Sequence, residues 1–146
     1  MQTKPSGPDD VFPPSETTDP EGMKLRETAA EGLTVRVEHR GSTAIVFLSG
    51  ELDLRSTAML SEKLENVEAE GPAVVVLDLR HLRFLDSTGV ALTIRAHKRA
   101  HEHGRRLVIV PGPARVQKPF ELAGLDSILD FREDAAERDP TNTPSS

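Results

Sequence analysis

Hydrophobic and polar positions in the first third of the chain follow the pattern of a β-hairpin. Apolar side chains fall at every second position over residues 33–39, which predicts a strand with one buried face. A polar turn over residues 40–42 leads into residues 43–50, which are apolar on both faces and predict a strand inside a sheet. Two adjacent strands joined by a short turn predict an antiparallel pair.

The next stretch carries the period of an amphipathic helix. Ser56 or Thr57 can cap a helix that runs to about Glu70, where Gly71-Pro72 stops it. The predicted buried side of this helix consists of Met59, Leu60, Leu64 and Val67. Residues 73–78 are continuously apolar, as in a strand that is covered on both faces, and a helix between two strands implies that the strands are parallel.

The rest of the chain repeats this alternation of helix and strand. A second helix is predicted to end near Gly104, and a short strand follows at residues 106–110. A third helix is expected from Ala114 to Gly124, and residues 128–131 are expected to form a last short strand. The order β-β-α-β-α-β-α-β predicts one α/β domain, with a mixed β-sheet and helices mainly on one side.

Composition and charge set two tails apart from this domain. The chain has 146 residues and a net charge of −6. Residues 1–31 are rich in Pro, Ser, Thr, Asp and Glu, with three basic against seven acidic side chains, and residues 133–146 have one arginine against four acidic side chains. Both segments are predicted to be disordered, which leaves residues 32–132 as the folded domain. The acidic balance argues against a nucleic-acid partner.

Several function classes are disfavoured by residues that the sequence lacks. It has no cysteine, no apolar run as long as a membrane span, and no signal-peptide-like start, so a cytoplasmic protein without a membrane partner is expected. There is no glycine-rich phosphate-binding loop, so no nucleotide cofactor is predicted. His97, His101 and His103 have a spacing compatible with a metal, but no clear carboxylate partner, and we expect no metal site.

The segment Phe84-Leu85-Asp86-Ser87-Thr88-Gly89-Val90 is the strongest candidate for a functional site. It lies between an apolar strand and a helix, so Ser87 is expected at a helix N-terminus. Backbone N–H groups there lack partners and carry partial positive charge, which suits a capping side chain and equally suits a phosphate. In the simpler alternative, Ser87 is only the helix cap and contributes about 1 kcal/mol to stability.

Two motifs in a fixed order resemble those of a known family. Gly50-Glu51-Leu52-Asp53 follows the second predicted strand, and Asp86-Ser87-Thr88-Gly89 follows the third. An apolar strand precedes the second motif, and a helix capped by Pro111-Gly112-Pro113 follows it. In these features residues 33 to about 131 resemble the STAS domain of the anti-sigma factor antagonists. These are small bacterial proteins that release a sigma factor by capturing the kinase that inhibits it.

The resemblance implies a function and a modification site. Ser87 matches the serine that is phosphorylated by an anti-sigma factor with serine-kinase activity, and a serine phosphatase would reset it. Asp53 and Asp86 would shape the site, together with Thr88 and Gly89. The unphosphorylated protein would bind the kinase and the phosphorylated one would not, so the chain would be a substrate rather than an enzyme. One departure is Val90-Ala91, where many members have Leu-Gly.

Two other interpretations remain open at this point. The chain could be a STAS-type binding or scaffold subunit, for example in lipid trafficking, a transporter assembly or nucleotide sensing, with Ser87 only a cap. A small enzyme using Asp53, Asp86 and Ser87 is a weaker alternative, since no histidine base accompanies the serine. The basic side chains near the end of the second helix are expected to be solvated; they are Arg95, Lys98, Arg99, Arg105 and Arg106.

Overall fold

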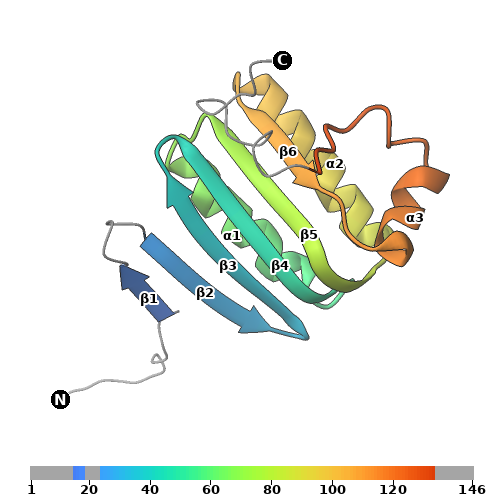
Figure 1. The fold of residues 1–146 in the computed structure, drawn as a ribbon, viewed down its shortest axis with the longest axis horizontal. Helices are drawn as coiled ribbons and strands as arrows, with labels where there is room; N and C mark the ends of the chain where they lie inside the picture. Colours follow the sequence, from blue (N-terminus) through green and yellow to red (C-terminus); the bar gives the residue numbers. More distant parts are fainter. Residues whose placement is uncertain (1–14, 19–23, 134–146) are drawn as a thin grey trace.

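The computed structural model describes residues 15–18 and 24–133, which form a β-sheet with helices mainly on one face (Figure 1). The elements in chain order are β1 (Ser15–Thr18), β2 (Lys24–Ala30), β3 (Leu33–Arg40), β4 (Thr43–Leu52), α1 (Thr57–Ala69), β5 (Val74–Leu85), α2 (Ser87–Glu102), β6 (Arg106–Val110) and α3 (Ala114–Leu122). None of the described helices is long and apolar enough to cross a membrane.

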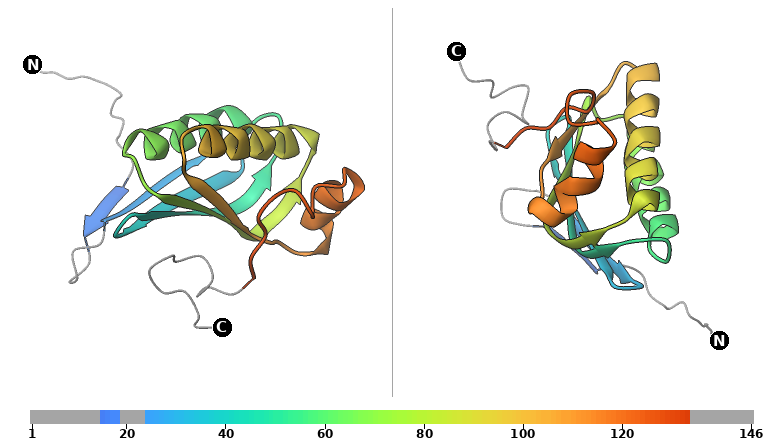
Figure 2. Two further views of the ribbon diagram at one scale, coloured as in Figure 1. Left: turned by 90° about the horizontal axis from the view of Figure 1, so that it is seen from above. Right: turned by 90° about the vertical axis from the view of Figure 1, so that its right-hand side faces the viewer.

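The six strands lie side by side in the order of the sequence. Strands β1 to β4 pair antiparallel, and β4, β5 and β6 pair parallel. Successive parallel strands step in the same direction across the sheet, so right-handed crossovers place α1 and α2 on the same face, as Figure 2 shows. Helix α3 packs against β5. The predicted mixed α/β sheet with helices mainly on one side is confirmed.

Alternation along the strands divides the apolar side chains between two faces. The larger cluster lies between sheet and helices, and its fully buried members include Leu48, Leu52, Leu60, Leu64, Leu77, Leu79, Leu82, Ile109 and Phe120. The smaller cluster is formed by the alternate strand positions Ile45, Val74, Val76, Val108 and Val110. On α1, three of the four side chains predicted as its buried side are buried and Met59 is half-buried, because the helix follows the expected period.

The N-terminal part of the sheet differs from the sequence prediction. Residues 1–31 were expected to form a tail, but Lys24–Ala30 forms β2 and pairs with β3, and Ser15–Thr18 pairs with β2 in turn. β2 is rich in polar residues, and backbone pairing with β3 holds it in the sheet. The rest of the predicted tails, residues 1–14, 19–23 and 134–146, lies outside the described residues.

Two further boundaries differ from the prediction. The strand expected over residues 73–78 continues to Leu85, because Leu79, Leu82 and Leu85 stay buried although exposed charged residues interrupt the apolar run. Residues 128–131 form one isolated bridge between Ile109 and Phe131 instead of a strand. Phe131 is held there by an edge-to-face contact with Phe120, whose ring centroid is 5.4 Å away.

Candidate functional site

The two sequence motifs meet at one end of the sheet. Strands β4 and β5 are parallel, so their carboxyl ends lie at the same edge, and Leu52 pairs in register with Leu85. The backbone N–H of Asp86 then donates a hydrogen bond of 3.2 Å to the carbonyl oxygen of Leu52. The structure therefore brings together the segments that carry all five predicted site residues.

Asp86 caps helix α2. Its Oδ1 atom accepts hydrogen bonds from the backbone N–H groups of Thr88, at 3.0 Å, and Gly89, at 3.3 Å. The Thr88 hydroxyl donates to the same oxygen at 2.5 Å. These bonds satisfy two of the N–H groups that a helix start leaves unpaired. The cap is complete without Ser87.

Ser87 is the first residue of α2 and its side chain is exposed. Its hydroxyl makes no hydrogen bond within the part of the chain that the structure describes. The alternative in which Ser87 is only the helix cap is therefore wrong, because Asp86 occupies that position. The hydroxyl lies at the positive end of a 16-residue helix, open to a partner.

Gly89 lets the start of α2 lie close to the two strands. A β-carbon at Gly89 would come within 3.0 Å of Leu85 Cγ and 3.1 Å of Leu52 Cγ, which is tighter than ordinary side-chain packing. The two leucines are buried and are the last residues of β4 and β5, where they pair with each other. The glycine thus allows the first turn of α2, which carries Ser87, to pack closely against the ends of β4 and β5.

Asp53 organises the loop between β4 and α1. Its Oδ1 accepts from the backbone N–H of Arg55 and its Oδ2 from the Arg55 guanidinium, both at 3.0 Å. The hydrogen-bonded guanidinium lowers the pKa of the Asp53 carboxyl. Arg55 also contacts Glu51 at 3.3 Å. No hydrogen bond joins Asp53 to Ser87 among the described residues, so Asp53 shapes the neighbouring loop rather than the hydroxyl itself.

Ser56 has a different role from the predicted one. It stands at the N-cap position of α1, but its side chain makes no capping bond. The buried hydroxyl instead donates to the carbonyl oxygen of Glu51 at 2.9 Å and accepts from the N–H of Asp53 at 3.1 Å. It therefore ties the first motif into a compact turn. The available signal in the sequence was the serine three residues after the end of Gly50-Glu51-Leu52-Asp53.

Leu54 is a surface residue that the sequence did not single out, and Phe84 was named only as the first residue of the candidate segment. Leu54 directly follows the first motif, and Phe84 is separated from the second motif by Leu85 alone. The exposed fraction is 73% for Leu54 and 48% for Phe84. Solvent-exposed apolar side chains of this size at a candidate site are typical of contact surfaces for other proteins.

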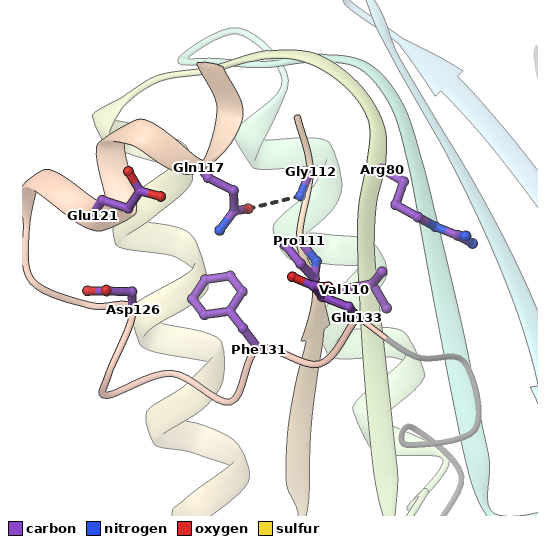
Figure 3. A pocket seen from close by; sticks show the side chains of 9 residues that line it. All are labelled: Arg80, Val110, Pro111, Gly112, Gln117, Glu121, Asp126, Phe131 and Glu133. Carbon is purple, nitrogen blue, oxygen red and sulfur yellow. Dashed lines mark hydrogen bonds between the residues drawn. The ribbon is translucent and has the colours of Figure 1, made fainter. Parts of the chain in front are cut away.

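A cavity of about 500 Å³ lies at the carboxyl end of β6, beside α3 (Figure 3). Its apolar lining includes Val110 and Phe131, and the N–H of Gly112 donates to Gln117 Oε1 at 2.9 Å. Ser87 does not line it. Within the described ranges, no three His, Asp or Glu side chains are grouped as a metal site requires.

Three of the basic residues expected to be solvated also make contacts within the domain, although Arg106 stays exposed. Arg99 on α2 makes two hydrogen bonds of 2.9 Å to Glu68 on α1, and this pairing raises the pKa of Arg99. Arg105 Nε donates to the carbonyl oxygen of Pro72, and Arg106 bonds to Asp130 at 2.8 Å. These partners lie in distant parts of the chain. The sequence around the end of a helix therefore does not indicate them.

Comparison with known proteins gives the family of the chain. The sequence model of the STAS domain matches residues 34–137. The chain belongs to the STAS domain family. The match begins inside β3, so β1 and β2 precede the part of this STAS protein that the family shares.

Named relatives of this STAS protein are regulators of sigma factors. It is 29% identical over 99 residues to the anti-sigma-F factor antagonist RsfB of Mycobacterium tuberculosis, covering 68% of this chain and 80% of RsfB. It is 25% identical over 111 residues to the anti-sigma-B factor antagonist of Listeria monocytogenes, covering 75% and 97%. The crystal structure of an anti-sigma factor antagonist from Mycobacterium paratuberculosis superimposes with a TM-score of 0.65 at 25% identity, covering 76% of this chain and 94% of that one.

Proposed function

We propose that this STAS protein is an anti-sigma factor antagonist that is switched by phosphorylation of Ser87. In its unmodified form it binds an anti-sigma factor with serine-kinase activity, and the sigma factor is released. The observation that carries the proposal is the exposed Ser87 hydroxyl in the first turn of α2, left out of a cap that Asp86 completes. The names of the relatives from Mycobacterium tuberculosis and Listeria monocytogenes support the role.

The position of Ser87 allows modification without unfolding. A phosphoserine adds about −1.5 to −2 units of charge and three acceptor oxygens. The start of a helix favours negative charge, and the capping bonds of Asp86 do not involve the Ser87 hydroxyl. Asp53, Asp86, Thr88 and Gly89 shape the surface on which the phosphate would stand.

The same charge is unfavourable for a docked partner. A partner surface matched to a neutral serine beside the Asp86 carboxylate would meet a dianion on phosphorylation. Unpaired or like charges at an interface cost several kcal/mol, and about 1.4 kcal/mol changes an affinity tenfold. Phosphorylation therefore separates the two proteins.

The partner supplies the catalytic groups. Phosphoryl transfer requires a bound nucleotide, a metal ion and a residue that positions the attacking hydroxyl. The chain has no phosphate-binding loop, so these come from the anti-sigma factor, and the antagonist is its substrate in the cytoplasm. A serine phosphatase would return Ser87 to its unmodified form.

Mass spectrometry after incubation with ATP and a purified serine-kinase anti-sigma factor tests this function. We expect one added phosphoryl group on the wild type, none on Ser87→Ala, and one on Ser127→Ala, which removes another exposed serine. Ser87→Asp should bind the anti-sigma factor more weakly than the wild type. Phosphorylation of Ser87→Ala, or equal binding by Ser87→Asp and the wild type, would refute the proposal.

A further inference from the structure

We infer that Leu54 and Phe84 are the apolar anchors through which the anti-sigma factor binds this protein. The inference rests on the proposed function and adds to it the residues that supply affinity. Ser87 acts as the switch, whereas Leu54 and Phe84 hold the partner in the unmodified state.

The distribution of exposed apolar side chains points to this end of the molecule. Four large hydrophobic side chains are exposed within the described part of the chain, and two of them, Leu54 and Phe84, flank the two motifs. Phe84 pairs in register with Glu51, the second residue of the first motif. Because Asp86 is hydrogen-bonded to Leu52, the segments carrying Leu54 and Ser87 also meet.

The geometry of phosphoryl transfer requires a partner to cover these residues. The kinase must bring the γ-phosphate of ATP to about 3–3.5 Å from the Ser87 hydroxyl. A specific protein interface buries about 800 Å² on each side, which extends well beyond one serine. Phe84 lies three residues before Ser87, and Leu54 lies two residues after Leu52, which is bonded to Asp86, so we expect an interface of that size around Ser87 to include both side chains.

The charged side chains at this end are already paired within the chain. Arg55 is bonded to Asp53 and contacts Glu51, and Arg83 lies 3.8 Å from Glu51. Asp86 is engaged by the N-terminus of α2. Exposed ion pairs that exist before binding add little net affinity, whereas a few side chains that become buried at the centre of an interface commonly carry most of it. The complementary partner surface is therefore apolar where it meets Leu54 and Phe84.

The separate roles of Ser87 as the switch and of Leu54 and Phe84 as anchors predict different effects on the phosphorylation kinetics. Removing an anchor weakens binding, but leaves the Ser87 hydroxyl and the kinase active site intact. We therefore expect Leu54→Ala and Phe84→Ala to raise KM for phosphorylation about tenfold or more, with kcat at saturating antagonist unchanged.

The test measures binding of unmodified protein to the purified serine-kinase anti-sigma factor, together with phosphorylation kinetics and thermal unfolding. Leu122→Ala and Ile128→Ala are matched controls, since these side chains are 78% and 62% exposed and do not flank either motif. Leu54→Ala and Phe84→Ala should each raise Kd about tenfold or more, while the controls bind like the wild type. All four variants should unfold at about the wild-type temperature, because the side chains are exposed.

The outcomes separate this inference from the function on which it rests. If the wild type is phosphorylated at Ser87 and the Leu54 and Phe84 variants bind as tightly as the wild type, the anchor role of these two residues is refuted. The proposed switch at Ser87 is then unaffected. Equal weakening by the two control variants would also overturn the anchors, because any exposed apolar residue would then have the same effect. If the wild type neither binds nor is phosphorylated, the proposed function fails, and the anchor role falls with it.

Discussion

The carbonyl oxygen of Gly32 occupies the space that a β-carbon on Gly50 would need. The same oxygen accepts a hydrogen bond of 3.0 Å from the backbone N–H of Glu51. Gly50 has a φ of +106°, a conformation that side chains disfavour. The turn between β2 and β3 thus packs directly against the first motif. This contact requires a glycine at position 50.

Gly50→Ala should destabilise the domain strongly. Both the backbone conformation and the contact with Gly32 oppose a β-carbon, and the conformation alone costs about 1–2 kcal/mol. Urea unfolding should show a loss larger than that of the control Gly41→Ala, where φ is +57° and no atom lies near the added carbon. Equal losses in the two variants would show that the Gly32 contact contributes nothing.

Removal of the α2 cap should have a larger effect on stability than removal of the Ser87 hydroxyl. Asp86→Ala removes the side-chain acceptor of the Thr88 and Gly89 N–H groups and should cost about 1 kcal/mol of unfolding free energy, although the Gly89 N–H keeps the Asp86 carbonyl oxygen, at 3.0 Å, as an acceptor. Asp86→Asn should retain most of that stability, because asparagine is also a good cap. Ser87→Ala should change stability by less than about 0.5 kcal/mol, as is usual for an exposed position. A greater loss in Ser87→Ala than in Asp86→Ala, measured by urea unfolding, would contradict this assignment.

Asp130 should make stability depend on acid pH. Burial alone would raise the pKa of Asp130, but hydrogen bonds from Arg132, at 2.7 Å, and Arg106, at 2.8 Å, hold it below the ordinary range. Because the folded state favours the carboxylate, its contribution is fully present above the unfolded pKa of about 3.9 and is lost as pH falls through the lower folded pKa.

The comparison variant for this effect is Asp130→Asn, which has no charge to lose. Wild type should be more stable than Asp130→Asn at pH 7, by up to about 1 kcal/mol for such a partly exposed pair. The difference should shrink as pH is lowered below about 4, as measured by the urea midpoint across the pH series. A difference that stayed constant from pH 7 to pH 3 would show that the charge of Asp130 is not responsible.

Elements with a local signal in the sequence have the bounds that were predicted for them. Helix α1 was expected to run to about Glu70 and ends at Ala69, and the predicted strand over residues 106–110 matches β6. Three of the four side chains predicted as the buried side of α1 are buried. In each case the apolar period lies within the element itself, or a stop signal such as Gly71-Pro72 directly follows it.

Predictions failed where a distant partner decides the structure. β2 is polar, and it is a strand because β3 offers backbone hydrogen bonds along its edge. β5 continues past its charged residues because β4 still pairs with it as far as Leu85. Arg99 was expected to be solvated, but it is partly buried and binds Glu68, which lies 31 residues away in the chain.

By itself the sequence determined the alternation of strands and helices, the fold class and the two motifs, because apolar period and turn residues act over a few neighbouring positions. Only the tertiary structure decided that the motifs meet through Asp86 and Leu52, and that Asp86 rather than Ser87 caps α2. It also decided that Leu54 and Phe84 are exposed beside them. These features depend on the parallel pairing of β4 with β5, which places segments that are distant in the sequence at one edge of the sheet.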